Sequence, residues 1–474
     1  MRLDRFEVVM NDFRMTPNER KATWGLGAVF SLRMLGMFMV LPVLTTYGMS
    51  LSGASEALIG LAIGIYGVTQ ALLQIPCGIL SDRLGRKPLI VGGLLIFALG
   101  SVIAALTDSI WGVILGRALQ GAGAIAAALM ALLSDLTREQ NRTKAMAFIG
   151  VSFGVTFSIA MVAGPLITHT LGLSGLFALI ALLALLGVLI TLYLIPVPTA
   201  HRLNREASMV RGAFGRVLVN PALLRLNAGI MCMHILLMSS FIALPPLMEQ
   251  AGLARGEQWK VYLGTMLVAF IAMVPGIIYA EKQRRMKQVF QFCVVILIAA
   301  EVVLWYAGLH LTGIILGILL FFCAFNMMEA MLPSLISKES PPGYKGTAMG
   351  VYSTCQFIGV AIGGILGGLV YARGGAEAVF TGCAVLAVMW FVISLTMREP
   401  PYVSSLRIVL PPTLAADAAL AQQLRQQAGV SDAILVADEH TAYIKIDSLV
   451  TSRAAIEQFL QCCAETAPST PKPM

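Results

Sequence analysis

Residues 78–88 read GILSDRLGRKP, a short charged turn between two long apolar runs. Gly78 lets two helices approach closely, and Gly85 permits a tight turn. The flanking runs, 58–80 and 89–106, are each long enough to cross the roughly 30 Å hydrocarbon core of a bilayer as a helix. The turn is therefore predicted to join two transmembrane helices. Its candidate functional residues are Gly78, Asp82, Arg83, Gly85, Arg86 and Lys87.

The composition of the chain is that of a membrane protein. Of its 474 residues, 58% are hydrophobic and 12% are charged, whereas about 25% of the residues in a soluble domain are charged. This excludes a soluble multidomain protein. The net charge of +8 comes from basic residues spread over short loops, so it does not indicate binding to nucleic acid.

Twelve apolar runs are long enough to span a membrane. Basic residues cluster in the loops that follow even-numbered runs, whereas the opposite loops carry Arg255, Lys260 and Arg373. By the positive-inside rule, we expect the basic loops and both termini in the cytoplasm, and the chain in the cell inner membrane. The runs cover residues 24–47, 58–80, 89–106, 110–133, 145–167, 173–195, 226–247, 261–280, 289–309, 313–336, 347–371 and 378–397.

The two halves of the chain resemble each other at an offset of 203 residues. Five residues of the first half align without gaps with five of the second: Ser134, Arg142, Ala145, Met146 and Gly164 with Ser337, Lys345, Ala348, Met349 and Gly367. Parallel repeats of this kind place a binding cavity at their interface, near the middle of the bilayer. The expected segments are a cytoplasmic N-terminal segment (1–22) without functional residues, six-helix bundles (23–197 and 225–399), a cytoplasmic linker (198–224) and a soluble domain (400–474).

Two further patterns lie inside the apolar runs. Residues 116–123 read GRALQGAG and place Arg117 and Gln120 within the fourth helix. An arginine inside the bilayer is costly, which makes Arg117 a candidate for proton coupling or for the electrostatics of the cavity, with a structural hydrogen-bonding role as the alternative. The fifth helix combines small residues with a proline: Gly150, Gly154, Gly164 and Pro165.

These patterns resemble signatures of the major facilitator superfamily. Residues 78–88 resemble GxxxDRxGRK and residues 116–123 resemble RxxQGxG; the fifth helix resembles the motif of twelve-helix drug–proton antiporters, with Ile167-Thr168 in place of a glycine pair. The resemblance implies that Asp82 meets the start of helix 11 near Gly346–Met349, and that Arg86 faces Asp135 at the end of helix 4. Such contacts would join the halves in the outward-open state and break in the inward-open state.

Four more ionisable residues lie within apolar runs: Arg33 in helix 1, His234 in helix 7, Glu301 in helix 9 and Glu329 in helix 10. Each is costly in lipid, so we expect each to face the cavity or a polar partner. A carboxyl removed from water favours its neutral form, which makes Glu329 the first candidate for proton exchange, ahead of His234 and Glu301. A structural hydrogen bond is the alternative for each. Arg33 stands where many drug antiporters have an acid, which argues against a general preference for lipophilic cations.

After Pro400-Pro401 the composition becomes that of a soluble domain. The patterns predict the order βαββα, with strands at 406–410, 430–436 and 441–446 and helices at 414–428 and 452–463. This resembles a ferredoxin-like α+β domain without an evident fourth strand, followed by a disordered tail from residue 464. Similar domains bind soft metals through a CxxC motif, which is absent from loop 411–413, so we expect no metal site.

Beyond its first ten residues, the whole chain resembles the YajR-type proton-driven efflux transporters of the superfamily. The resemblance implies alternating access and a regulatory C-terminal domain. We expect proton-coupled efflux of a small amphipathic compound, with protons as the coupling ion, no cofactor and no enzymatic activity. The alternatives are a symporter of the same fold and a transport-inactive sensor acting through residues 403–463. The transporter body is expected to be a monomer in the lipid bilayer, and self-association through the terminal domain is left open.

Overall fold

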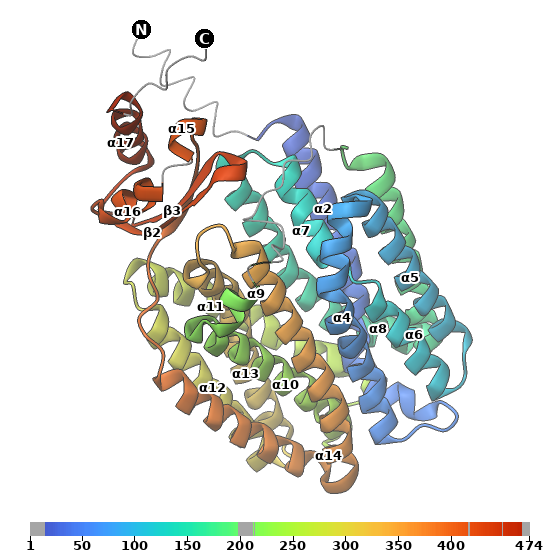
Figure 1. Ribbon diagram of the computed structural model, residues 1–474. Helices are drawn as coiled ribbons and strands as arrows, with labels where there is room; N and C mark the ends of the chain where they lie inside the picture. The colour runs from blue at the N-terminus through green and yellow to red at the C-terminus, as the bar shows by residue number, and fades with distance from the viewer. Residues whose placement is uncertain (1–14, 198–211, 213, 416–417, 448, 467–474) are drawn as a thin grey trace.

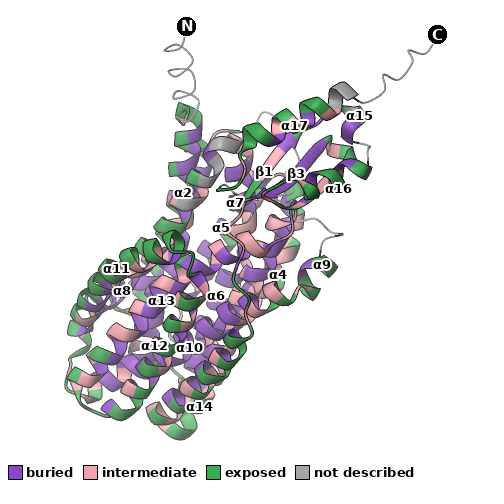
Figure 2. Cartoon of the chain, turned by 90° about the vertical axis from the view of Figure 1, so that its left-hand side faces the viewer, coloured by how far each residue is buried: buried purple, intermediate pink, exposed green. Residues whose placement is uncertain are grey.

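The computed structural model describes residues 15–197, 212, 214–415, 418–447 and 449–466. Two helical bundles lie side by side, and a small domain with a sheet lies at one end of them (Figure 1). Most of the expected linker and the end of the tail lie outside the described residues. Large apolar side chains such as Leu182, Ile271 and Val392 are exposed, and exposed residues are spread over the outside of the helical bundles (Figure 2). Such a surface is suited to contact with lipid.

Ten helical segments among the described residues are long and apolar enough to cross a membrane. Two of them, α8 and α14, have 51 residues each, roughly 76 Å of helix at 1.5 Å per residue. Each breaks at a glycine with positive φ, Gly172 (72°) or Gly375 (64°), and so makes two spans. These glycines are 203 residues apart, the offset of the sequence repeat. The predicted fold class of twelve transmembrane helices is confirmed.

The helices of the first bundle follow one another through short connections. They are α2 (Pro17–Met39), α3 (Leu41–Tyr47), η1 (Gly48–Ser50), α4 (Glu56–Leu84), α5 (Arg86–Leu106), α6 (Ile110–Ala122), α7 (Ala126–Leu136), α8 (Glu139–Leu189) and η2 (Ile190–Leu194). The second bundle comprises α9 (Phe214–Val219), α10 (Pro221–Gln250), η4 (Arg255–Glu257), α11 (Gln258–Lys282), α12 (Met286–Ala307), α13 (Leu311–Glu339) and α14 (Lys345–Leu395).

The closest approach between the bundles joins α4 to α14 through glycines. Gly60 lies against Gly364 and Gly368, and a Cβ built on Gly64 would lie only 2.7 Å from the carbonyl oxygen of Ala361. Small residues at both faces allow the two backbones to touch, which gives dispersion contacts that larger side chains would prevent.

The bundles also meet at the end opposite the turn at residues 78–88. The guanidinium of Arg255 lies 5.7 Å from the centre of the Tyr47 ring, and Gly256 packs against the ring of His169. Both contacts join loops or helix ends of different bundles. The bundles are therefore held together at this end as well as along α4 and α14.

The C-terminal domain is a three-stranded antiparallel sheet of order β1-β3-β2, covered by helices on one face. The central strand β3 is buried on both faces: Ala442, Ile444 and Ile446 face the helices, and Tyr443 and Lys445 face the transporter body. The predicted strands and helices are found, and α17 runs to Thr466, past the expected start of the tail. The elements are β1 (Ser404–Val409), α15 (Pro412–Ala415), α16 (Ala418–Gln426), β2 (Val430–Val436), η5 (Ala437–Glu439), β3 (Thr441–Ile446) and α17 (Arg453–Thr466).

The sheet docks on the basic end of the second bundle. The ammonium of Lys445 donates to the carbonyl oxygens of Ser337 and Lys338 in the last turn of α13, where the helix dipole favours a cation. Arg284, in the α11–α12 loop, pairs with Asp447 at 2.9 Å. The Tyr402 hydroxyl accepts from the backbone N–H of Met286, at the start of α12. These contacts fix the domain to three helix ends of one bundle.

Substitution of Gly64 by leucine tests the contact between α4 and α14. We expect Gly64→Leu to destabilise the protein by about 1–3 kcal/mol, because the new side chain collides with the backbone of α14. Gly92→Leu is the matched control, because nothing lies within 4 Å of a Cβ at Gly92. Thermal unfolding of the two purified variants in detergent provides the measurement. Equal melting temperatures would contradict the contact.

Removal of the Asp447 carboxylate tests the docking of the terminal domain. The guanidinium of Arg284 lowers the pKa of Asp447 below its usual range, so the pair is intact at neutral pH and is lost as the pH falls through that lowered value. We expect Asp447→Ala to speed tryptic cleavage between residues 398 and 407. Asp432→Ala is the control, since it removes an exposed ion pair with Arg425 within the domain. Unchanged cleavage of Asp447→Ala would show that this pair does not hold the domain.

Candidate functional site

The turn at residues 78–88 is built around a nearly buried arginine. Gly85, with φ 94°, separates α4 from α5 and starts the turn that directs Arg86 inward. The Arg86 side chain pairs with Asp82 and, at 3.1 Å, with Asp135 near the end of α7. Arg86 also donates to the Ser81 hydroxyl, which in turn donates to the carbonyl oxygen of Gly78. The structure thus brings together Arg86 and Asp135, as the family resemblance implied.

Asp82 does not reach the other bundle in this structure. Its ion-pair partner is Arg86, and none of the contacts described for Asp82 joins it to α14 near Gly346–Met349. The resemblance assigned that contact to the outward-open state, whereas the bundles here meet at the opposite end. Of the remaining bases, Arg83 is exposed, and Lys87 donates to the carbonyl oxygen of Ile195 at 2.7 Å.

A residue that the sequence analysis missed, Glu19, ties the first helix to the segment that follows Asp135. Its carboxylate accepts from the backbone N–H and the guanidinium of Arg138 and from the amide of Asn141, at 2.7–3.3 Å. It also completes a capping box with Thr16. The spacing Thr16-x-x-Glu19 is a capping-box signature and could have indicated the helix start. Its partner Arg138 lies only three residues from Asp135.

The interior of the first bundle contains two chains of polar side chains. Arg117 donates to the carbonyl oxygen of Ala62 at 3.3 Å and to Gln120 at 2.8 Å, and its guanidinium lies 4.7 Å from the centre of the Tyr66 ring. The amide N–H of Gln120 donates a hydrogen bond to the Ser101 hydroxyl. Arg33 donates to Gln70 at 2.5 Å. The arginines of helices 1 and 4 are thus buried, and Arg117 has several protein partners.

In the second bundle, one amide links two of the predicted proton-coupling candidates. The Nε2 atom of Gln356 lies 2.9 Å from Nε2 of His234 and 3.3 Å from Oε1 of Glu329. The other ring nitrogen of His234, Nδ1, lies 3.1 Å from the carbonyl oxygen of Ile230. Because a carbonyl only accepts, Nδ1 carries a hydrogen, and Nε2 of the neutral ring accepts from Gln356. The sequence analysis missed Gln356, since an uncharged amide in a helix carries no signal by itself.

Glu301 lies in a separate place within the second bundle. The Ser240 hydroxyl donates to its Oε1 at 3.0 Å, and its Oε2 is enclosed without a hydrogen-bond partner. The Ser240 oxygen also lies 3.9 Å from the sulfur of Cys383. The structure therefore does not bring Glu301 together with His234 and Glu329. In the described part of the chain, no cluster of three or more His, Cys, Asp or Glu residues forms a candidate metal site.

The glycines of the fifth helix, the first part of α8, have different surroundings. A Cβ on Gly154 would lie 3.4 Å from the ring of Phe270 on α11, in the other bundle, and Gly164 lies against the backbone of Met39. Nothing lies within 4 Å of a Cβ at Gly150. Pro165 is buried inside the helix. Gly154 and Gly164 therefore contribute to close packing, one of them across the interface of the bundles.

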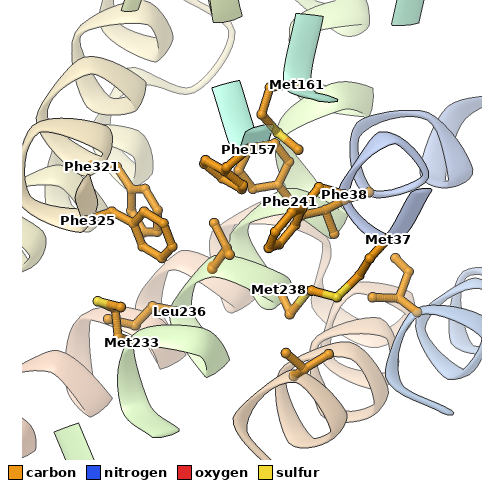
Figure 3. Close-up of a cluster of buried hydrophobic side chains, with 14 of the residues drawn as sticks. Met37, Phe38, Phe157, Met161, Met233, Leu236, Met238, Phe241, Phe321 and Phe325 are labelled. Atoms are coloured by element: carbon orange, nitrogen blue, oxygen red, sulfur yellow. The ribbon is translucent and has the colours of Figure 1, made fainter. Parts of the chain in front are cut away.

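Aromatic and methionine side chains from both bundles meet at the centre of the interface (Figure 3). The Phe157 ring lies 4.8 Å from that of Phe38 and 5.4 Å from that of Phe325, which in turn lies 5.9 Å from the His234 ring. Met37, Met161, Met233 and Met238 belong to the same cluster. Thioethers and rings adapt to apolar molecules of varied shape.

The family follows from a match over most of the membrane part of the chain. The sequence profile of the Major Facilitator Superfamily matches residues 26–364, and that of the YajR YAM domain matches residues 406–462. The chain belongs to the major facilitator superfamily. A curated relative, the inner membrane transport protein YajR of Escherichia coli K12, is 65% identical over 452 residues, which cover 95% of this chain and all of the relative.

The chain is also similar to a more distant relative and to a solved structure. The multidrug resistance protein MdtH of Aeromonas hydrophila is 26% identical over 367 residues, 75% of this chain and 87% of the relative. A bacterial homologue of the human lysosomal transporter Spinster, solved in an inward-facing and occupied conformation, matches with a TM-score of 0.65 at 15% identity, over 81% of this chain and 97% of that chain. At 15% identity, the likeness to the Spinster homologue concerns the fold alone.

Loss of Asp135 tests the buried ion pair of this superfamily member. The side chains of Arg86 and Asp135 are 7% and 5% exposed, so Asp135→Ala leaves a buried cation and should destabilise the protein by about 3 kcal/mol, the lower end for such pairs because Asp82 remains. The control Glu257→Ala removes a pair with Lys260 whose side chains are more than half exposed, and should leave the stability nearly unchanged because water screens the pair. Similar melting temperatures for the two variants would contradict a stabilising role of the buried pair.

Proposed function

We propose that this chain exports a small amphipathic compound in exchange for protons, by alternating access. The observation that supports this best is the linked group His234, Gln356 and Glu329, contributed by α10, α14 and α13. Oε2 of Glu329 is enclosed and has no hydrogen-bond partner, so this carboxyl has a free position for a proton. Ionisable groups within a membrane protein mark proton and substrate pathways.

The shared amide provides a way for protonation to change the packing of the bundles. Gln356 donates to both Nε2 of His234 and Oε1 of Glu329. A proton taken up at Nε2 of His234 turns this acceptor into a donor, so the Gln356 N–H must leave it. A proton taken up at the free Oε2 of Glu329 removes the negative charge and weakens the hydrogen bond that Oε1 accepts from Gln356. The next residue, Phe357, packs on Tyr66 with ring centres 6.2 Å apart, and its carbonyl oxygen faces Gly67 of α4. Proton binding in the second bundle would thus change its contact with the first.

The rest of the proposal concerns the substrate and the direction of transport. The cluster of phenylalanine and methionine side chains at the interface suits an apolar molecule with a polar end. Efflux is supported by relatives that are named multidrug resistance proteins. The positive-inside rule, applied to the basic loops, supports a cytoplasmic location of both termini. We further propose that protons are the coupling ion, that no metal or organic cofactor takes part, and that the transporter body acts as a monomer.

Transport by purified protein in proteoliposomes, under an imposed proton gradient, tests this function. The panel contains lipophilic cations, organic anions and neutral amphiphiles. We expect Glu329→Gln to abolish gradient-driven accumulation while retaining exchange of substrate between the two sides, because a neutral side chain that cannot lose a proton still permits substrate exchange. Glu377→Gln, at an exposed glutamate, should behave like the parent.

Three results would contradict the proposal. Equal gradient-driven flux in Glu329→Gln and the parent would remove this carboxyl from the coupling. Accumulation in the direction of the proton flux would indicate a symporter. Binding of a compound without flux, together with a change in the terminal domain, would indicate a membrane sensor.

A further inference from the structure

Arg33 is a buried cation without a sufficient set of partners. It lies at the middle of the first membrane span (Pro17–Ser50), and it is 1% exposed. Its Nη2 donates to Oε1 of Gln70, and its guanidinium lies 5.8 Å from the centre of the Phe97 ring. Its Nε and Nη1 are enclosed and have no hydrogen-bond partner. In the described part of the chain, no carboxylate forms an ion pair with it.

The hydrogen bonds of Gln70 hold the Arg33 guanidinium in place but leave its positive charge without a counter-charge. The Gln70 amide N–H donates to Oε1 of Gln74 at 2.8 Å, and this orients the Gln70 oxygen toward Arg33. An amide oxygen accepts a hydrogen bond but brings no negative charge. Arginine stays protonated in proteins, so it cannot relieve the cost of burial by losing its proton. An arginine at the centre of a membrane helix is costly, and a bound anion would offset that cost.

Comparison with Arg117 shows that burial alone does not explain these open donors. Arg117 is buried in the same bundle, yet its guanidinium has a carbonyl, an amide and an aromatic ring as partners. A structural role accounts for Arg117 and leaves Arg33 unexplained. The difference therefore points to a partner for Arg33 that the chain itself does not supply.

The position of Arg33 is suited to a molecule that enters between the bundles. Met37, one helical turn away, lines an enclosed void with Tyr66 and Arg117 of the first bundle and with Met238 and Val360 of the second. This void holds about one water molecule, so an organic compound would fit only when the bundles separate. The aromatic and methionine cluster begins at Met37 and Phe38 on the same helix.

We propose that Arg33 binds an acidic group, a carboxylate or a sulfonate, of the transported compound. The inference rests on the proposed function and specifies its substrate class: an amphipathic organic anion whose apolar part packs on the aromatic and methionine cluster. The guanidinium supplies two charge-assisted hydrogen bonds through Nε and Nη1. In this assignment, the carboxyls of the other bundle, Glu329 and Glu301, bind the coupling protons.

Binding to the full-length protein, purified in detergent, tests the assignment without any proton gradient. The probes are matched derivatives of one scaffold, 2-naphthoic acid, 2-naphthamide and 2-naphthylmethylamine, with chloride as an inorganic anion. We expect the acid to raise the melting temperature of the parent more than the other probes do. Arg33→Gln should weaken binding of the acid roughly tenfold to a hundredfold, the loss of one charge-assisted hydrogen bond or more. Arg33→Lys should bind with intermediate affinity, because it keeps the charge and loses the planar donors.

A second readout needs no ligand. Because Arg33→Gln removes an uncompensated buried charge, the ligand-free variant should melt at or above the temperature of the parent. Arg373→Gln, at an exposed arginine, is the control and should leave both readouts unchanged. A clear loss of stability in ligand-free Arg33→Gln would mean that the fold itself compensates the guanidinium, and would overturn the assignment.

The other outcomes of the binding test are equally decisive. Preference for the amine, equal shifts for all three derivatives including no shift, or undiminished binding of the acid to Arg33→Gln each overturn the proposal. A shift with chloride as large as that with the acid would make Arg33 an inorganic anion site. Failure of proton-driven flux alongside acid binding that depends on Arg33 would count against the antiport mechanism alone.

Discussion

The backbone contact between α4 and α14 is the constraint on which the rest of the structure depends. It exists because glycines face one another at successive turns of both helices, from Gly60 and Gly364 to Gly67 and the carbonyl of Phe357. In lipid, close packing of this kind replaces the hydrophobic effect as the source of helix association. The α4 glycines present no side chains of their own, and Ile365 and Val360 of α14 pack onto Gly64 and Gly67. Such a contact would suit the reorientation of the two bundles that the proposed alternating access requires.

The ionisable groups are distributed unequally around this contact. The first bundle carries Arg33 and Arg117 in its interior, and the second carries His234, Glu301 and Glu329. Since charges in a membrane interior persist only with partners or a function, each of these groups calls for a reason. Hydrogen bonds within the chain provide one for Arg117. For the carboxyls we propose exchangeable protons, and for Arg33 we propose an incoming anion.

The terminal domain and the turn at residues 78–88 use polar contacts of a different kind. At the basic end of the protein, ion pairs join elements that are distant in sequence, as Arg284 joins Asp447 and Arg138 joins the buried Glu19. Tyr402 lies between the cations of Arg284 and Lys338, at the point where the chain leaves the membrane bundle. Because Lys338 ends α13, which also carries Glu329, the docked domain rests on a helix that contributes to the candidate proton site.

The sequence by itself determined the membrane class, the spans, the repeat and the charged turn, because length, apolar content and local motifs act within one segment of chain. It also predicted the three strands, where alternation and turn residues sufficed. It could not predict that Gln356 joins His234 to Glu329, that Glu19 binds Arg138, or that Nε and Nη1 of Arg33 stay without a hydrogen-bond partner. Those facts depend on which side chains meet after helices pack. Only the tertiary structure decides such contacts, because distances between residues far apart in the chain follow from the packing of whole bundles.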